Sequence, residues 1–104
     1  MLPEADTFVR NLPFKALDKM AYNIKLVAAG AADTEIFKKL HGSDIWEIRA
    51  LFNGIAYRLF AFWDTRDGAL MVATHGIIKK RDKVPRKEIE KAERIRIQYF
   101  NQQS

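Results

Sequence analysis

The sequence lacks cysteine and has only two histidines, three prolines and five glycines among its 104 residues. Without cysteine there can be no disulfide scaffold, no thiolate metal site and no cysteine nucleophile. Two histidines and no cluster of acidic residues leave few ligands for a catalytic metal, so neither a metal nor another cofactor is expected. A Gly-rich phosphate loop and a Gly-x-Ser-x-Gly elbow are also missing, which excludes the common nucleotide-binding loop and the α/β-hydrolase nucleophile.

Long apolar runs are missing as well. No stretch approaches the roughly 18 apolar residues that a membrane span needs, and the first residues do not have the layout of a signal peptide. We therefore expect no membrane contact and a cytoplasmic location. The length predicts a single domain over residues 1–104, with a core of modest size.

Negative charge is scarce in one segment of the chain. Residues 79–96 hold nine Lys or Arg and four Asp or Glu, a net of +5, whereas the rest of the chain holds nine of each. A basic patch confined to one segment is typical of proteins that bind RNA or DNA. A solvated basic face that keeps the protein soluble is the alternative, and charge alone does not decide between the two.

Hydrophobic periodicity predicts helices at both ends of the chain. Residues 4–12 and 13–28 show apolar side chains at the 3.6-residue period, which predicts an N-terminal helical hairpin. Residues 33–40 are expected to add one more helical turn. A closing helix is expected over residues 86–100, and its apolar face is formed by Ile89, Ala92, Ile95 and Tyr99.

The segment between the helices predicts a three-stranded antiparallel sheet. Asn53-Gly54 is a strong hairpin signal, because a type I′ turn needs positive φ at both central residues. Strands are expected over residues 45–52, 55–64 and 69–78, with a second turn at residues 65–68. The fold class is therefore expected to be α+β, with the helical hairpin packed on a small sheet and a C-terminal helix after it.

The Asn53-Gly54 turn also predicts the register of the first hairpin. A two-residue turn sets Arg49 directly opposite Arg58, in a pair where side chains come close together. Like charges in such a pair are destabilising unless an anion binds there. If the second turn has two or four residues, His75 and then Lys79 lie on the same face as the two arginines; a turn of three or five residues would place His75 on the other face.

The two faces of the predicted sheet differ in character. The uncharged face is expected to be the core under the helical hairpin, and it contains Trp46, Ile48, Ala50, Phe52, Ile55, Tyr57, Leu59 and Ala61. The other face combines the cations with the apolar side chains Leu51, Phe60 and Phe62. A sheet face of cations and aromatic rings suits phosphates and unstacked bases.

RNA can be cleaved without a metal by groups of the kind found on this face. A base removes the proton of a 2′-hydroxyl, the oxygen attacks the adjacent phosphate, and an acid protonates the leaving 5′-oxygen, while arginines stabilise the developing charge. His75 titrates in the right range, and Lys79 or Lys80 could act if neighbouring cations favour the neutral amine. A hydrogen-bonded structural histidine and a solvated basic turn are the alternatives.

Four motifs follow one another in the sequence: Trp46-Glu47-Ile48-Arg49, Ala56-Tyr57-Arg58-Leu59, His75-Gly76-Ile77-Ile78-Lys79-Lys80 and Val84-Pro85-Arg86-Lys87-Glu88-Ile89. The four motifs together resemble those of the phage-derived, HigB-like branch of the RelE superfamily of toxins. The resemblance covers about residues 4–100. The resemblance implies the toxin of a type II toxin–antitoxin system, an endoribonuclease that cleaves mRNA at the ribosome without a metal. It also implies a helix-turn-helix antitoxin of the HigA kind as partner.

The resemblance assigns residues by position. The catalytic face would be formed by Arg49, Arg58, His75, Lys79 and Lys80, with the two arginines binding phosphate and the others as candidates for proton transfer. We expect the basic segment to contact RNA through Lys83, Arg86, Lys87, Lys91 and Arg94. A non-catalytic RNA-binding module and a protein-binding element that docks an antitoxin are the alternative functions on the same fold.

Relatives of this kind open with a short strand before the first helix. This chain begins where that strand would end, so we expect the sheet to lack it. An open sheet edge can pair with another chain, which makes a homo- or hetero-oligomer possible.

Overall fold

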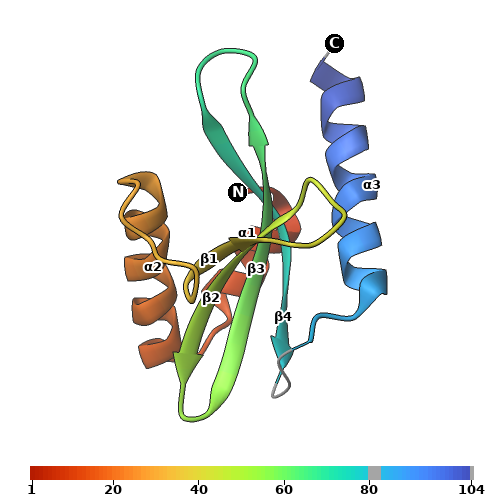
Figure 1. Cartoon of the computed structure of the whole chain (residues 1–104). Helices are drawn as coiled ribbons and strands as arrows, with labels where there is room; N and C mark the ends of the chain where they lie inside the picture. Colours follow the sequence, from red (N-terminus) through yellow and green to blue (C-terminus); the bar gives the residue numbers. More distant parts are fainter. Residues whose placement is uncertain (80–82, 104) are drawn as a thin grey trace.

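The computed structural model describes residues 1–79 and 83–103, and within these the fold is α+β, as predicted (Figure 1). The helices are α1 (Pro3–Arg10), α2 (Phe14–Ala28) and α3 (Arg86–Gln103). The strands are β1 (Phe37–Lys39), β2 (Trp46–Phe52), β3 (Ile55–Asp64) and β4 (Leu70–Lys79), and they form one antiparallel sheet in the order β1-β2-β3-β4. No helix in these residues is long and apolar enough to cross a bilayer.

Strand β1 corrects the prediction for residues 33–40. Instead of a helical turn, the chain makes a turn in which Asp33 Oδ1 accepts the N–H groups of Glu35 and Ile36, and then pairs with β2. The ring of Phe37 stacks on Trp46 at 4.5 Å between centroids. A single helical turn costs more to nucleate than it gains, so pairing with the edge of β2 prevails. The sheet consequently has four strands in place of the three predicted.

The uncharged face of the sheet is the core under α1 and α2, as predicted. The sheet contributes Ile48, Ala50, Tyr57, Leu59 and Ala61 to this core, and the two helices contribute Ala5, Val9, Ala16 and Met20. Three residues of the predicted face are only half-buried: Phe52 and Ile55 pack against this core, and Trp46 stacks on Phe37. Helix α1 crosses β4 at Gly76, where a Cβ atom would lie 2.3 Å from the ring of Phe8, so only glycine permits this approach.

The other face of the sheet is partly covered by α3, which corrects the prediction for its aromatic residues. Figure 1 shows the sheet lying between α2 and α3. Phe60 and Phe62 are both fully buried and belong to a second core with Leu40, Ile45, Val72 and Ala92. These two rings are therefore part of the hydrophobic core and are not available for stacking on bases.

The register confirms the predicted Arg49–Arg58 pair and explains the position of His75. Asp64 pairs with Leu70, so the second turn has five residues, a length that alone would send His75 to the other face. A β-bulge compensates, because Ala61 pairs with Ala73 whereas Phe60 pairs with His75. The extra residue in β4 returns His75 to the face of the two arginines.

The outer edge of β4 carries no further strand within the described residues. One backbone contact reaches it, because the N–H of Leu2 donates to the carbonyl of Ala73 at 3.0 Å. This edge is therefore contacted by Leu2.

The C-terminal half of α3 is anchored to the end of β3. Asp64 accepts hydrogen bonds from the Arg66 side chain at 3.1 and 2.9 Å and from the Tyr99 hydroxyl at 2.8 Å. The Arg66 guanidinium also lies over the ring of Phe100, 4.7 Å from its centroid. The side-chain and backbone hydrogen bonds of Arg66, with that of Tyr99, hold the pKa of Asp64 well below its usual range.

The hydrogen bonds that Asp64 accepts from Arg66 and Tyr99 predict that the folded protein loses stability in acid. Because the folded pKa of Asp64 lies below its unfolded value of about 3.9, the stabilisation is complete above that pH and is lost as the pH falls below it. We expect Asp64→Asn, which cannot titrate there, to flatten the loss of stability between about pH 5 and pH 2. Urea unfolding at several pH values measures this. Asp67→Asn, in the same turn and exposed, is the control; parallel curves for wild type and Asp64→Asn would contradict the prediction.

Candidate functional site

The predicted cations meet at one end of the sheet, which we call the cationic end. It is formed by Arg49 of β2, Arg58 of β3 and Lys79 of β4. Arg49 pairs with Arg58, and Lys79 pairs with Ala56, which is two residues from Arg58 and on the same face. Arg49 and Lys79 are half-buried, and Leu51 beside them is 44% exposed, so this end of the face is open to solvent. It lies toward the C-terminal end of β4 (Figure 1).

Arg58 lies behind this open surface and has an acidic partner. Its side chain is fully buried, and its Nη1 donates to both carboxylate oxygens of Glu47 at 3.0 Å. Glu47 itself is only 1% exposed. The anion that the Arg49–Arg58 pair requires is thus supplied by the protein. Sequence reasoning missed Glu47, although the predicted register already places it opposite residue 60, diagonal to Arg58.

Arg49 is held by its backbone and keeps its guanidinium available. Its N–H donates to the carbonyl of Ile36 at 2.7 Å, and its carbonyl accepts from Asn23 Nδ2 at 2.8 Å. Asn23 is buried on α2, so strand and helix together fix the Cα position of Arg49. Within the described residues the Arg49 Nε is buried without a hydrogen-bond partner. Such an unpaired donor favours an anionic ligand at this side chain.

His75 is buried and uses both of its ring nitrogens. Nε2 lies 3.1 Å from Oε1 of Glu88 in the first turn of α3, and Nδ1 lies 2.9 Å from the hydroxyl of Thr74. The imidazole is 1% exposed. Burial lowers the pKa of His75 and the positive charge of Lys91 lowers it further, whereas the hydrogen bond to Glu88 opposes both. Glu88 was also missed by sequence reasoning, although it stands in the fourth motif.

A family model described as phage-derived protein Gp49-like (DUF891) matches residues 7–96. The chain belongs to this family. The match runs from α1 through most of α3 and includes both arginines, His75 and Lys79. Gp49-like membership supports a phage-derived, toxin-type protein with a toxin–antitoxin context. Among curated proteins and among solved structures, nothing matches the chain.

The basic segment of this Gp49-like protein points mostly to solvent. Lys83, Arg86, Lys87 and Arg94 are exposed, and Lys91 is half-buried. Lys91 forms an ion pair with Glu4 of α1, with 2.5 Å between Nζ and Oε2. Arg86 forms an ion pair with Glu90, with 3.6 Å between Nε and Oε2. The predicted catalytic residue Lys80 lies outside the described residues. The hydrogen bond of His75 to Glu88 ties the first turn of this helix to β4 opposite Phe60, which is two residues from Arg58 and on the same face.

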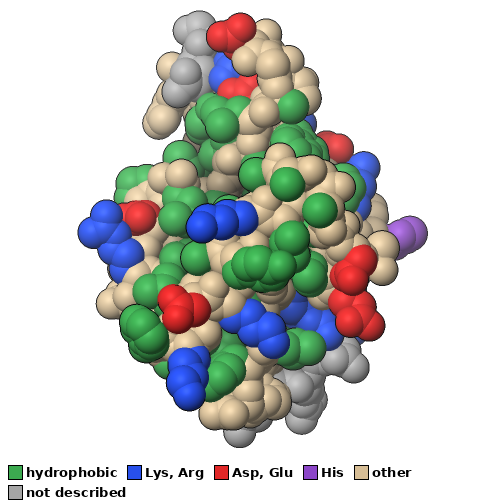
Figure 2. Space-filling view, turned by 90° about the vertical axis from the view of Figure 1, so that its left-hand side faces the viewer, with side chains coloured by type: hydrophobic (Ala, Val, Ile, Leu, Met, Phe, Trp, Pro, Cys, Tyr) green, Lys and Arg blue, Asp and Glu red, His purple; other side chains and the backbone are tan. Residues whose placement is uncertain are grey.

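The opposite side of the Gp49-like fold, which carries α2, has no comparable concentration of cations. Figure 2 shows Lys and Arg side chains dispersed there among apolar and acidic ones. The two aromatic residues of α2, Phe14 and Tyr22, are 76% and 61% exposed. This side does not provide a continuous basic surface for a nucleic acid.

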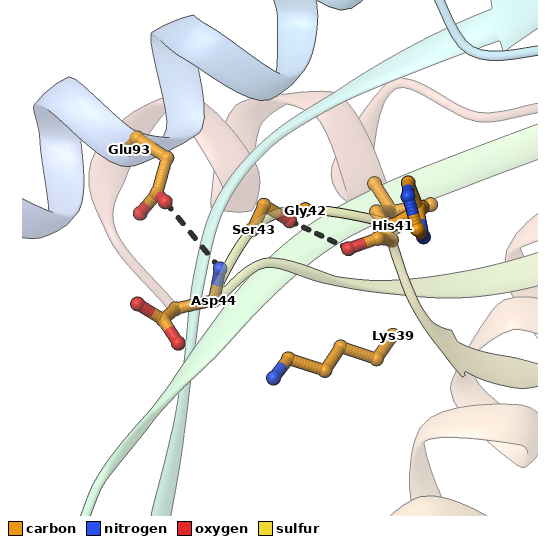
Figure 3. Close-up of a pocket in the computed structure, with 7 residues that line it drawn as sticks. Lys39, His41, Gly42, Ser43, Asp44 and Glu93 are labelled. Carbon is orange, nitrogen blue, oxygen red and sulfur yellow. Dashed lines mark hydrogen bonds between the residues drawn. The ribbon is translucent and has the colours of Figure 1, made fainter.

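A polar hollow of about 530 Å³ lies between the β1–β2 loop and α3 (Figure 3). It is lined by Lys39, Leu40, His41, Gly42, Ser43, Asp44 and Glu93. The N–H of Asp44 donates to Glu93 Oε2 at 3.4 Å, the carboxylates of Asp44 and Glu93 each lie 3.7 Å from Arg96, and His41 lies at the other end of the loop. Such a lining suits a phosphate poorly. No three His, Asp or Glu side chains in residues 1–79 and 83–103 gather as metal ligands do.

Proposed function

We propose that this Gp49-like protein is the toxin of a type II toxin–antitoxin system, of the HigB-like branch, and cleaves mRNA at the ribosome as a metal-independent endoribonuclease acting in the cytoplasm. The observation that carries the proposal is the cationic end of the sheet, where Arg49 and Lys79 lie half-buried on the same face as the exposed Leu51. The exposed cations at the start of α3 add to the positive charge of the protein. Family membership and the order of the four motifs support it.

The arrangement suits phosphate chemistry. Arg49 offers a planar fork of donors for the scissile phosphate, whereas the charge of Arg58 behind it is balanced by Glu47. We assign proton transfer to Lys79 and Lys80. One amine takes the proton of the 2′-hydroxyl as the O2′–P bond forms, and an ammonium protonates the 5′-oxygen as the P–O5′ bond breaks. The products are a 2′,3′-cyclic phosphate and a 5′-hydroxyl.

The proposed partners follow from the same assignment. A helix-turn-helix antitoxin of the HigA kind would neutralise the toxin, and mRNA on the ribosome would be its substrate. The outer edge of β4 is where a homo- or hetero-oligomer would form, since no further strand of the described residues covers it.

A second candidate function is favoured by the burial of Arg58 and His75. Two of the five proposed catalytic side chains do not reach solvent, which suits a protein that binds RNA through surface cations and does not cleave it. In that case binding weakens steeply with salt, as expected for contacts to phosphates.

Expression and cleavage assays separate the two candidates. We expect induced expression to arrest growth, and new 5′ ends to appear by primer extension in a defined mRNA only when it is bound to ribosomes. Added antitoxin, encoded beside the toxin, should abolish both effects. Salt-sensitive RNA binding without new 5′ ends would support the non-catalytic candidate and contradict the nuclease.

A further inference from the structure

We propose that His75 is a positioning residue: through its hydrogen bond to Glu88, which we call the latch, it fixes the basic first turn of α3 beside the cationic end. This inference rests on the proposed function and changes the role expected for His75. A proton-transfer residue must reach the RNA, whereas the latch acts only within the protein.

The geometry leaves His75 no free nitrogen. Glu88 Oε1 occupies the Nε2 side at 3.1 Å and the Thr74 hydroxyl occupies the Nδ1 side at 2.9 Å. An ionised carboxylate oxygen can only accept a hydrogen bond, so Nε2 carries a proton and donates a hydrogen bond to Glu88. The ring is 1% exposed and packs against Phe60, with 5.0 Å between centroids. To touch RNA, His75 would have to break the latch and leave the core.

The surrounding hydrogen bonds accommodate both protonation states of His75. In the neutral ring, the Thr74 hydroxyl donates to Nδ1. In the charged ring, Nδ1–H donates to the Thr74 oxygen, whose hydroxyl can turn to the carbonyl of Phe60 at 3.4 Å. The charged groups that face the ring are Glu88 and Lys91 of α3 and Glu4 of α1. The latch therefore holds whether or not His75 is protonated, as suits a positioning role.

The latch restrains the cations proposed to bind RNA. Arg86 and Lys87 immediately precede Glu88 in the first turn of α3, and both are exposed. One turn further on, Lys91 is tied to Glu4 of α1. In the same part of α3, Ile89 packs against the second core, and the latch adds a polar contact that sets where the turn lies. Ordering these cations in advance lowers the entropic cost of RNA binding.

The test compares His75→Gln with His75→Ala. A glutamine amide can still donate to Glu88 but cannot transfer a proton, so it separates positioning from acid–base chemistry. We expect His75→Ala and Glu88→Ala to weaken binding of a labelled single-stranded RNA about tenfold, the effect of losing one charge-assisted hydrogen bond. His75→Gln should bind and cleave close to wild type, with an unchanged pH profile. Glu90→Ala, which removes a neighbouring carboxylate of equal charge beside Arg86, should not weaken RNA binding.

Amide hydrogen exchange of residues 86–91 gives a second readout. Exchange should be faster in His75→Ala and Glu88→Ala, and unchanged in His75→Gln. The inference is overturned if exchange is the same in all variants, or if His75→Gln binds RNA normally yet cleaves as poorly as His75→Ala. If the wild type neither binds nor cleaves RNA, the proposed function fails, and the exchange data alone decide whether the latch exists.

Discussion

Replacing Glu47 with leucine is expected to lower the free energy of unfolding by about 3–5 kcal/mol, because it leaves the buried charge of Arg58 without its carboxylate. Both side chains are almost fully shielded from solvent, so water cannot replace the lost partner. For a domain of this size the loss would be a large part of the total stability, which is about 5–15 kcal/mol. Replacing Arg58 with methionine leaves the buried carboxylate of Glu47 without this arginine and should also destabilise the fold.

The double variant Glu47→Leu/Arg58→Met separates charge from packing. Exchanging a whole buried ion pair for apolar residues of similar volume is often neutral or stabilising, so the double variant should recover most of the loss. Urea unfolding followed by tryptophan fluorescence gives all the free energies. Glu90→Leu, which removes an exposed carboxylate from α3, should change stability by less than about 0.5 kcal/mol. Additive losses in the double variant would show that the two side chains do not stabilise each other.

The first hairpin could be predicted from sequence because its information is local. Asn53 and Gly54 adopt positive φ values of 53° and 73°, as the turn type demands, and the pairing of Arg49 with Arg58 follows. The apolar face could be predicted for a related reason, since the period of two separates it cleanly from the charged face. Local turn chemistry and periodicity thus determined most of the sheet.

The second hairpin shows where local rules fail. Its turn has five residues, and the bulge at Thr74 cancels the change of face that such a turn causes, so the correct face for His75 results from two compensating irregularities. A bulge has no clear sequence signal when no glycine marks it. Likewise, β1 replaces a helical turn because the edge of β2 is available, which is a tertiary effect.

The acidic partners of the site were missed because sequence reasoning considered cations alone. Glu47 lies on the charged face two residues before Arg49, so the alternation of side chains was sufficient to find it. Glu88 could not be placed in this way, since its contact with His75 depends on how α3 crosses the sheet. The same crossing buries Phe60 and Phe62, which the period of two can only place on a face. Helix packing therefore decides which part of the charged face stays open.

Replacing Arg49 with alanine is expected to reduce cleavage of ribosome-bound mRNA by about 100- to 1,000-fold, the usual effect of removing one group that stabilises the charge of a transition state. Arg49→Lys should lose nearly as much, because an ammonium group lacks the planar fork that binds two phosphate oxygens. Folding should be spared, since the hydrogen bonds that hold Arg49 in place come from its backbone N–H and carbonyl.

A matched control removes the same charge elsewhere. Arg10→Ala deletes an exposed arginine of α1 that pairs with Asp6, far in sequence from the cationic end. It should leave cleavage unchanged, whereas Arg49→Ala should also reduce the salt dependence of RNA binding by about one phosphate contact. Equal cleavage by wild type and Arg49→Ala, with both proteins folded, would mean that the scissile phosphate does not bind at this arginine. Equal salt dependence would mean that Arg49 contacts no phosphate at all, and the unpaired Nε would then need another explanation.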